Sequence, residues 1–259
     1  MTASFLMPVL FIGHGSPMNA IEDNEWSASW AALAQALPRP KAILCISAHW
    51  ETRGAYVSAT PTPETIHDFY GFPKALFDVH YPAPGSPELA KRIAGLISDP
   101  PIHLDPGRGL DHGSWSVLCR MYPEADISVI QLSLDTRQPG GYHYQLGTQL
   151  QALREEGVLI IGSGNIVHNL GLFRFHDKEP YDWAERFRKQ ANQLIQAGDH
   201  LKLADFHSLG VDARHAIPTP EHYLPLLYVL ALQRPGERVS LFNDVVFSSL
   251  SMTSVTVGL

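Results

Sequence analysis

The amino-acid sequence predicts an α/β fold: a single domain with a mostly parallel central sheet flanked by helices. Short apolar runs rich in Val, Ile and Leu recur along the chain. Each is followed by polar or glycine residues and then by a longer amphipathic stretch, which is the pattern of βαβ units. The runs are apolar throughout, as expected of strands buried on both faces. No change in composition divides the 259 residues, so residues 1–259 are expected to form one domain.

The apolar runs predict four buried strands, at residues 8–12 (PVLFI), 42–46 (AILCI), 127–134 (ISVIQLSL) and 158–161 (VLII). Helical periodicity predicts helices at residues 87–97, 115–122, 142–156, 181–197 and 220–232. The final segment, residues 239–259, alternates and is rich in Val, Ser and Thr. It is therefore expected to close the sheet as a hairpin or an edge strand.

Two of the predicted helices have readable start signals. Residues 86–88 (SPE) offer a capping serine, a proline suited to the first helical position and a first-turn acid. At the last helix, Thr219 and Pro220 place the start at residue 220. Pro225 would then interrupt a backbone hydrogen bond, and it favours a start nearer Tyr223.

Charge and cysteine content limit the partners and the compartment. With 26 acidic and 19 basic residues the formal charge is −7, and there is no basic stripe for nucleic acid or polybasic anchor for a membrane. Cys45 and Cys119 lie in apolar segments, and a chain of this size needs no disulfide, which favours a reducing compartment. Residues 1–10 lack the features of a signal peptide, and no apolar run approaches 18 residues. We therefore expect a soluble, cytoplasmic protein that binds neither nucleic acid nor membrane.

Several standard motifs are absent from the sequence. The chain has no Gly-Lys-Ser/Thr, and its two Gly-x-Gly segments, at residues 13–15 and 162–164, lack the third glycine of a dinucleotide fingerprint. Ser163 has a glycine on each side, whereas a nucleophile elbow has glycines two positions away, which disfavours a serine hydrolase. There is no H-E-x-x-H and no C-x-x-C. Any metal site must therefore be assembled from distant segments.

The 13 histidines make imidazole the main candidate for metal or proton chemistry. His14, His49 and His168 each come just after a predicted buried strand. Ligands of open α/β sheets bind outside the carboxyl ends of the strands, so these three imidazoles converge if their strands are neighbours. A structural role is the alternative for any one of them, but three equivalent positions favour a joint site.

Three further histidines have informative surroundings. His222 falls in the first turn of a helix that begins at residue 220, where the helix dipole disfavours imidazolium and leaves the neutral ring that a metal requires. The alternative is an exposed first-turn histidine without a role. His112 precedes the helix at 115–122, in a segment that also reads as a helix cap and turn. His67 is a loop histidine beside an acid, Asp68.

With these residues placed, the sequence resembles the 4,5-DOPA extradiol dioxygenase family, a branch of the class III extradiol ring-cleaving dioxygenases. The resemblance runs from about Pro8 to Leu259. It is carried by residues 13–19 (GHGSPMN), 47–50 (SAHW), 66–69 (IHDF), 71–73 (GFP), 81–85 (YPAPG), 111–115 (DHGSW), 162–170 (GSGNIVHNL) and 220–225 (PEHYLP). It implies one α/β domain with a mononuclear metal at the strand ends. The implied reaction cleaves a catechol ring beside its two hydroxyls and inserts dioxygen.

The resemblance also implies roles for particular histidines. His14 and His49 correspond to metal ligands, and His222 is the third ligand where protocatechuate-type relatives use a late glutamate. His168 matches the acid–base histidine of those relatives and in this branch is either that or a further ligand. His112 matches a histidine that lines the substrate side of the pocket.

Aromatic residues beside these motifs are candidates for the walls of a pocket for a planar ring, namely Trp50, Phe69, Tyr70, Trp115 and Tyr223. Of these, Trp50 and Tyr223 are predicted to contact substrate, together with His67. Core packing is the alternative for each.

The resemblance and the histidines together predict a metal-dependent extradiol dioxygenase whose partners are a catechol, such as 4,5-DOPA, and O2. We expect one divalent metal ion per chain, Fe(II) for the dioxygenase activity, with Zn(II) able to occupy the same site. One alternative is a zinc hydrolase that uses metal-bound hydroxide, with His168 as general base. Another is a metal-binding or partner-binding domain without enzyme activity.

Overall fold

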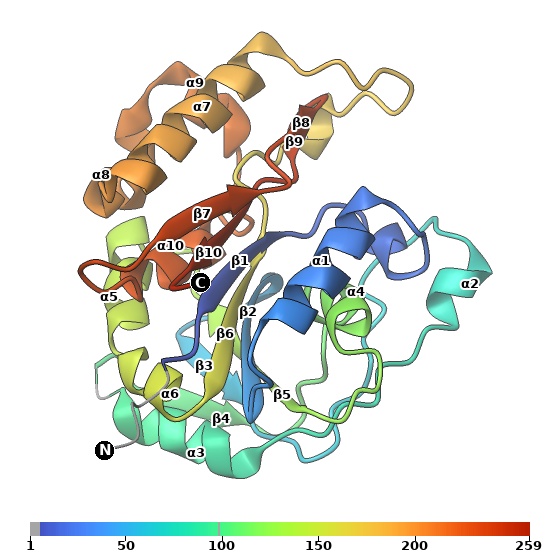
Figure 1. Ribbon diagram of the computed structural model, residues 1–259, viewed down its shortest axis with the longest axis vertical. Helices are drawn as coiled ribbons and strands as arrows, with labels where there is room; N and C mark the ends of the chain where they lie inside the picture. Colours follow the sequence, from blue (N-terminus) through green and yellow to red (C-terminus); the bar gives the residue numbers. More distant parts are fainter. Residues whose placement is uncertain (1–5, 98) are drawn as a thin grey trace.

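The computed structural model describes residues 6–97 and 99–259, and its centre is a sheet in the order β4-β3-β5-β2-β6-β1-β10-β7 (Figure 1). These strands are β1 (Val9–Gly13), β2 (Ala42–Glu51), β3 (Ala55–Ser58), β4 (Ile102–Asp105), β5 (Ser128–Leu134), β6 (Val158–Gly164), β7 (Val239–Phe242) and β10 (Ser254–Val257). Two short strands, β8 (Val246–Phe247) and β9 (Leu250–Ser251), form a separate pair.

The sheet is mostly parallel, which confirms the predicted fold class. β5, β2, β6 and β1 run parallel to one another, and β4 is parallel to β3. β3 pairs antiparallel with β5. β10 is antiparallel to both β1 and β7, so the C-terminal segment closes the sheet as expected, with β7 at its edge. The four-residue strands β3 and β4 were not predicted, because neither forms an extended apolar run.

The helices of the described residues are α1 (Glu25–Ala36), α2 (Lys74–Phe77), α3 (Pro87–Leu96), α4 (His112–Met121), α5 (Gly140–Thr148), α6 (Gln151–Glu155), α7 (Asp182–Ala197), α8 (His200–Ala204), α9 (Val211–Ala216) and α10 (Leu224–Ala231). Short 3-10 turns are η1 (Pro17–Ala20), η2 (Leu170–Leu172) and η3 (Phe206–Leu209). None of these helices is long and apolar enough to cross a membrane.

Helix starts partly follow the sequence signals. Ser86 caps α3 by accepting from the Leu89 backbone N–H. The single helix expected over 142–156 is wrong, because a turn separates α5 from α6. The last helix begins at Leu224 rather than Pro220, as Pro225 indicated, so His222 lies in a turn before the helix and the dipole argument for it fails.

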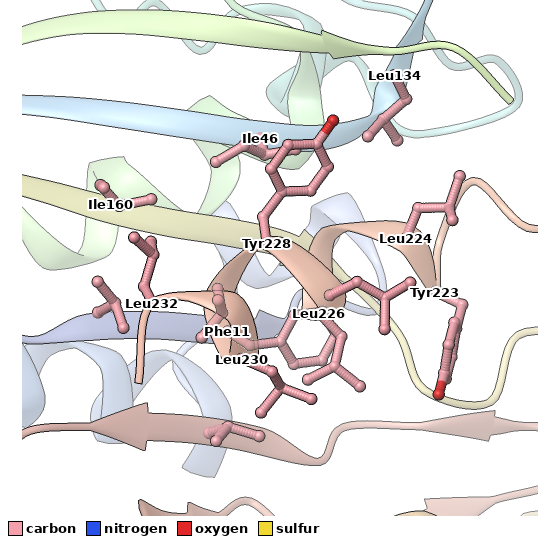
Figure 2. Close-up of a cluster of buried hydrophobic side chains, with 14 of the residues drawn as sticks. Phe11, Ile46, Leu134, Ile160, Tyr223, Leu224, Leu226, Tyr228, Leu230 and Leu232 are labelled. Carbon is pink, nitrogen blue, oxygen red and sulfur yellow. The ribbon is translucent and has the colours of Figure 1, made fainter. Parts of the chain in front are cut away.

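Both faces of the sheet are covered, as continuous apolar strands require. Helices α1 and α4 lie on one side, and α5 and α10 on the other (Figure 1). Every residue of α10 is buried, and its side chains pack over Phe11, Ile46 and Ile160 of the strands (Figure 2). This central helix holds the preceding turn, which carries His222, against the end of β6, where Asn165 donates its backbone N–H to the His222 carbonyl.

A buried ion pair ties the N-terminal strand to the last helix. Arg154 of α6 is fully buried and makes a bidentate pair with Glu237 at 2.6 and 2.8 Å. The same guanidinium donates to the carbonyls of Met7 and Leu232. Such a pair contributes most visibly when one partner is lost, since the other charge is then buried alone.

We expect Glu237→Ala to lower the free energy of unfolding by about 3 kcal/mol, because Arg154 would be left without its carboxylate. Urea titration at neutral pH measures this change. The matched control is Glu155→Ala, which removes an exposed Glu–Arg pair with Arg234 and is expected to cost less than about 1 kcal/mol. Equal losses for the two variants would contradict the assignment.

Candidate metal centre at the strand ends

Five histidines meet at one edge of the sheet. His14 directly follows β1, and His49 lies near the end of β2. His168 comes four residues after β6 ends, His112 is the first residue of α4, and His222 lies two residues before α10. Because β2, β6 and β1 are neighbours in the sheet, the convergence predicted from the sequence is confirmed.

Three of these rings form a nearly equilateral triangle. Ring centroids are 5.1 Å apart for His14 and His49, 5.3 Å for His14 and His222, and 5.0 Å for His49 and His222. The Nε2 atoms of His14 and His49 are 3.2 Å apart. Two nitrogens each about 2.1 Å from one metal lie roughly 3.0 to 3.4 Å apart for angles between 90° and tetrahedral. The triangle therefore fits three ligands on one face of a single divalent metal.

The other two histidines flank this triangle unequally. His112 is 3.8 Å from His49 but 5.9 Å from His14, measured between ring centroids. His168 stacks on His222 at 3.4 Å with an angle of 9° between the rings. Ligand atoms within 4.8 Å of one another define two separate groupings, His14 with His49 and His112, and His168 with Glu221 and His222. The triangle takes His14 and His49 from the first grouping and His222 from the second. We favour it as the candidate metal set because its three ring separations all lie between 5.0 and 5.3 Å.

Hydrogen bonds set the protonation of two of the triangle's rings. The Ser163 hydroxyl donates to the Gly113 carbonyl at 2.5 Å, so its oxygen accepts from Nδ1–H of His14 at 3.0 Å. Nδ1 of His222 is 3.1 Å from a Glu221 oxygen, which can only accept when the carboxylate is ionised. Both rings therefore carry their proton on Nδ1 and leave the Nε2 lone pair available for a metal.

A carboxylate also holds His112. Oδ1 of Asp68 accepts from Nδ1–H and from the backbone N–H of His112, both at 2.9 Å. Oδ2 of Asp68 is 3.8 Å from Nδ1 of His49, too far for a hydrogen bond. The His112 ring is thus oriented by Asp68, with its Nε2 free.

Close packing around the rings requires glycine at two positions. A Cβ on Gly113 would lie 2.4 Å from the Ser47 hydroxyl and 2.8 Å from the His49 ring. A Cβ on Gly164 would lie 2.0 Å from the His222 carbonyl oxygen. Glycine at position 113 therefore lets the start of α4 pack against His49, and glycine at position 164 lets the His222 turn pack against the end of β6.

Burial keeps these imidazoles neutral. Desolvation, followed by the neighbouring imidazoles, lowers the pKa of His14 and of His222 well below the usual value. Burial likewise lowers the pKa of His49 and that of His168 to about 4. A metal binds neutral imidazole, so the ligands are ready at neutral pH without losing a proton.

The three predicted substrate contacts lie outside this cluster. Trp50 is 5% exposed, and the Arg108 guanidinium lies over its ring, with Cζ of Arg108 5.1 Å from the Trp50 ring centroid. His67 donates from Nε2 to the Val79 carbonyl at 3.0 Å and packs beside Trp115. Tyr223 is fully buried in the hydrophobic core (Figure 2), and its hydroxyl donates to the Leu203 carbonyl. These positions favour core packing, the alternative stated for each residue.

Phe69, a pocket-wall candidate, does reach the cluster. Its ring meets that of His112 edge-on, with centroids 5.6 Å apart. The orienting roles of Asp68, Ser163 and Glu221 were missed from the sequence. The only signals in the sequence were that Asp68 and Glu221 each adjoin a histidine and that Ser163 lies at a strand end. Proximity in sequence does not show which imidazole a side chain contacts.

Comparisons with known proteins agree with the motifs. A family model described as the catalytic LigB subunit of aromatic ring-opening dioxygenase matches residues 8–258. A 4,5-DOPA dioxygenase extradiol of Escherichia coli (strain K12) is 49% identical over 264 residues, covering 99% of this chain and 96% of that protein. One from Beta vulgaris is 39% identical over 241 residues, 90% of each protein. A crystal structure of an uncharacterized protein from Escherichia coli K12 matches with a TM-score of 0.84 at 44% identity, covering 97% of this chain and 100% of that one.

We expect Ser163→Ala to weaken metal binding about 10- to 100-fold, because His14 loses the acceptor that holds its proton on Nδ1. Competition with a chelator under anaerobic conditions measures the affinity for Fe(II) or Zn(II). The control is Ser116→Ala, since the buried Ser116 hydroxyl has no hydrogen-bond partner among the described residues. An unchanged affinity for Ser163→Ala would show that the His14 tautomer does not depend on this bond.

Proposed function

The chain belongs to the family of the catalytic LigB subunit of aromatic ring-opening dioxygenase, and we propose that it opens a catechol related to 4,5-DOPA in an Fe(II)-dependent extradiol reaction. The observation that carries the proposal is the equal-sided triangle of neutral rings formed by His14, His49 and His222. Family membership favours ring opening over the zinc hydrolase considered from the sequence and over a binding domain without activity.

The residues present fit a single divalent metal. The lone pairs on Nε2 of His14 and His222 are left free by their Nδ1 hydrogen bonds, and Nε2 of His49 lies 3.2 Å from that of His14. Three ligands on one face leave positions for both catechol oxygens and for dioxygen. Fe(II) held there would let electrons pass from the bound catechol to dioxygen, whereas Zn(II) fits the same nitrogens and has no redox chemistry.

Two further histidines are placed to handle protons. The ring-opened product would retain both atoms of O2. A catechol that chelates a metal through both oxygens must release its hydroxyl protons, so the site needs a proton acceptor. Nε2 of His112 is unprotonated because Nδ1–H is donated to Asp68, so it can accept one of these protons. His168, neutral and stacked on His222, is the second acceptor and donor in the pocket, and in this proposal it is an acid–base group.

The walls of the pocket suit a planar ring. Phe69 lies edge-on to His112 and adjoins His67 and Trp115, so the aromatic face begins beside the proposed proton acceptor. We place the substrate ring against this face. We also infer a cytoplasmic location, which the two free cysteines support.

The direct test is anaerobic loading with Fe(II), followed by oxygen and a panel of catechols that includes 4,5-DOPA. We expect stoichiometric oxygen uptake and a yellow ring-opened product. The Zn(II)-loaded protein is the control and is expected to show neither. Absence of oxygen uptake with every catechol at full iron occupancy would refute the proposal.

Single alanine variants test the division of roles. His14→Ala, His49→Ala and His222→Ala should each abolish stoichiometric iron binding, because each removes one corner of the triangle. His112→Ala should retain iron but lower turnover by about 100-fold, the contribution typical of a positioned acid–base group. Iron content and kcat measured on the same preparations distinguish the two classes. Equal iron loss in all four variants would place His112 among the ligands.

A further inference from the structure

We propose that Asp68 is a positioning residue for the ring-opening reaction: it holds the His112 ring with Nδ1 protonated, so that Nε2 faces the site as a proton acceptor. The inference rests on the proposed function, because it assigns Asp68 a role through a histidine that contacts the substrate. Asp68 reaches His112 from the segment between β3 and α2, 44 residues earlier in the chain.

The Asp68 carboxylate binds His112 at two points. One oxygen, Oδ1, accepts from both the ring Nδ1–H and the backbone N–H, each at 2.9 Å. The backbone N–H belongs to the first residue of α4, where helix N–H groups lack partners within the helix and a negative charge is favourable. The paired bonds therefore fix the direction of the ring relative to the helix start, which a single ring bond would not do.

Asp68 is an acceptor at neutral pH. Oδ1 accepts from the His112 backbone N–H, which can only donate. Burial alone would raise the pKa of Asp68, but the hydrogen bonds from the ring and the backbone of His112 lower that pKa below its usual value. An ionised carboxylate cannot donate, so Nδ1 of His112 must. The proton on Nδ1 leaves the second ring nitrogen with a lone pair.

The geometry separates His112 from the metal ligands. Within the described part of the chain, the carboxylate of Asp68 hydrogen-bonds to His112 alone, since Nδ1 of His49 is 3.8 Å away. His14 and His222 have their own partners in Ser163 and Glu221. Loss of Asp68 should therefore disturb proton acceptance and leave the metal in place.

The first experiment reads the tautomer without any turnover. In Zn(II)-loaded protein, two-bond correlations between imidazole protons and 15N report which ring nitrogen of His112 is protonated, with its signals assigned by comparison with His112→Gln. We expect Nδ1–H in the unmodified protein and a mixture of both tautomers in Asp68→Ala. A His112 ring protonated at Nε2 in the unmodified protein would overturn the inference, whatever the enzyme's activity.

The second experiment uses Asp68→Ala in the iron-loaded enzyme, because an asparagine oxygen at this position would still accept both hydrogen bonds from His112. We expect kcat to fall about 10- to 100-fold while iron content and KM for the catechol stay within about twofold. Asp78→Ala is the matched control, because it makes the same change just beyond α2, where Asp78 pairs with Lys74 at the surface, and it should leave both constants unchanged.

The possible outcomes separate the two proposals. An unchanged kcat for Asp68→Ala would overturn the positioning role. A fall in kcat matched by loss of iron would also overturn it, by assigning Asp68 to His49. If the unmodified iron enzyme opened no catechol, the proposed function would fail, while the tautomer measurement would still stand or fall independently.

Discussion

The parallel pairing of β1 and β2 with the strand between them, β6, is the constraint on which the rest of the site depends. It brings the ends of all three strands to one edge of the sheet. The end of β6 consists of small residues that point alternately to the two faces of the sheet. Ser163 faces the His14 ring, whereas Gly162 and Gly164 let the backbone around α10 approach to distances that no Cβ would permit. A side chain at Gly164 would displace the turn that carries His222 from its place beside His14 and His49.

The imidazoles differ in the hydrogen-bond partner of Nδ1, which is a serine hydroxyl for His14 and a carboxylate for His222 and His112. Burial lowers the pKa values of the rings of the triangle, and hydroxyl or carboxylate partners on Nδ1 leave the Nε2 lone pairs of His14 and His222 available. Such orienting partners matter because an imidazole binds a metal or accepts a proton through one nitrogen only, and the bond made by the other nitrogen selects it. The same arrangement on His112, through Asp68, leaves a lone pair on Nε2 of a ring outside the triangle.

Much of the fold was predictable because its signals are local. The buried strands were visible as apolar runs, and Ser86 and Pro225 marked helix starts correctly. The four-residue strands β3 and β4 lacked such a signal. The helix expected over 142–156 is divided after Thr148, next to Gly147, which lies against Tyr228 of α10. Tyr223 shows the same limit: it follows His222 in sequence, but its side chain is buried in the core, where its hydroxyl donates to the Leu203 carbonyl.

By itself, the sequence determined the fold class, the family and the five histidines of the site, because motif residues and strand ends are properties of short segments. The tertiary structure decided which three rings form the equal-sided triangle, which two flank it, and which neighbours orient them. Asp68 meets His112 from 44 positions away, and Ser163 meets His14 from 149 positions away. Contacts of that kind depend on strand order and on close backbone approach, and neither is written in the spacing of the residues.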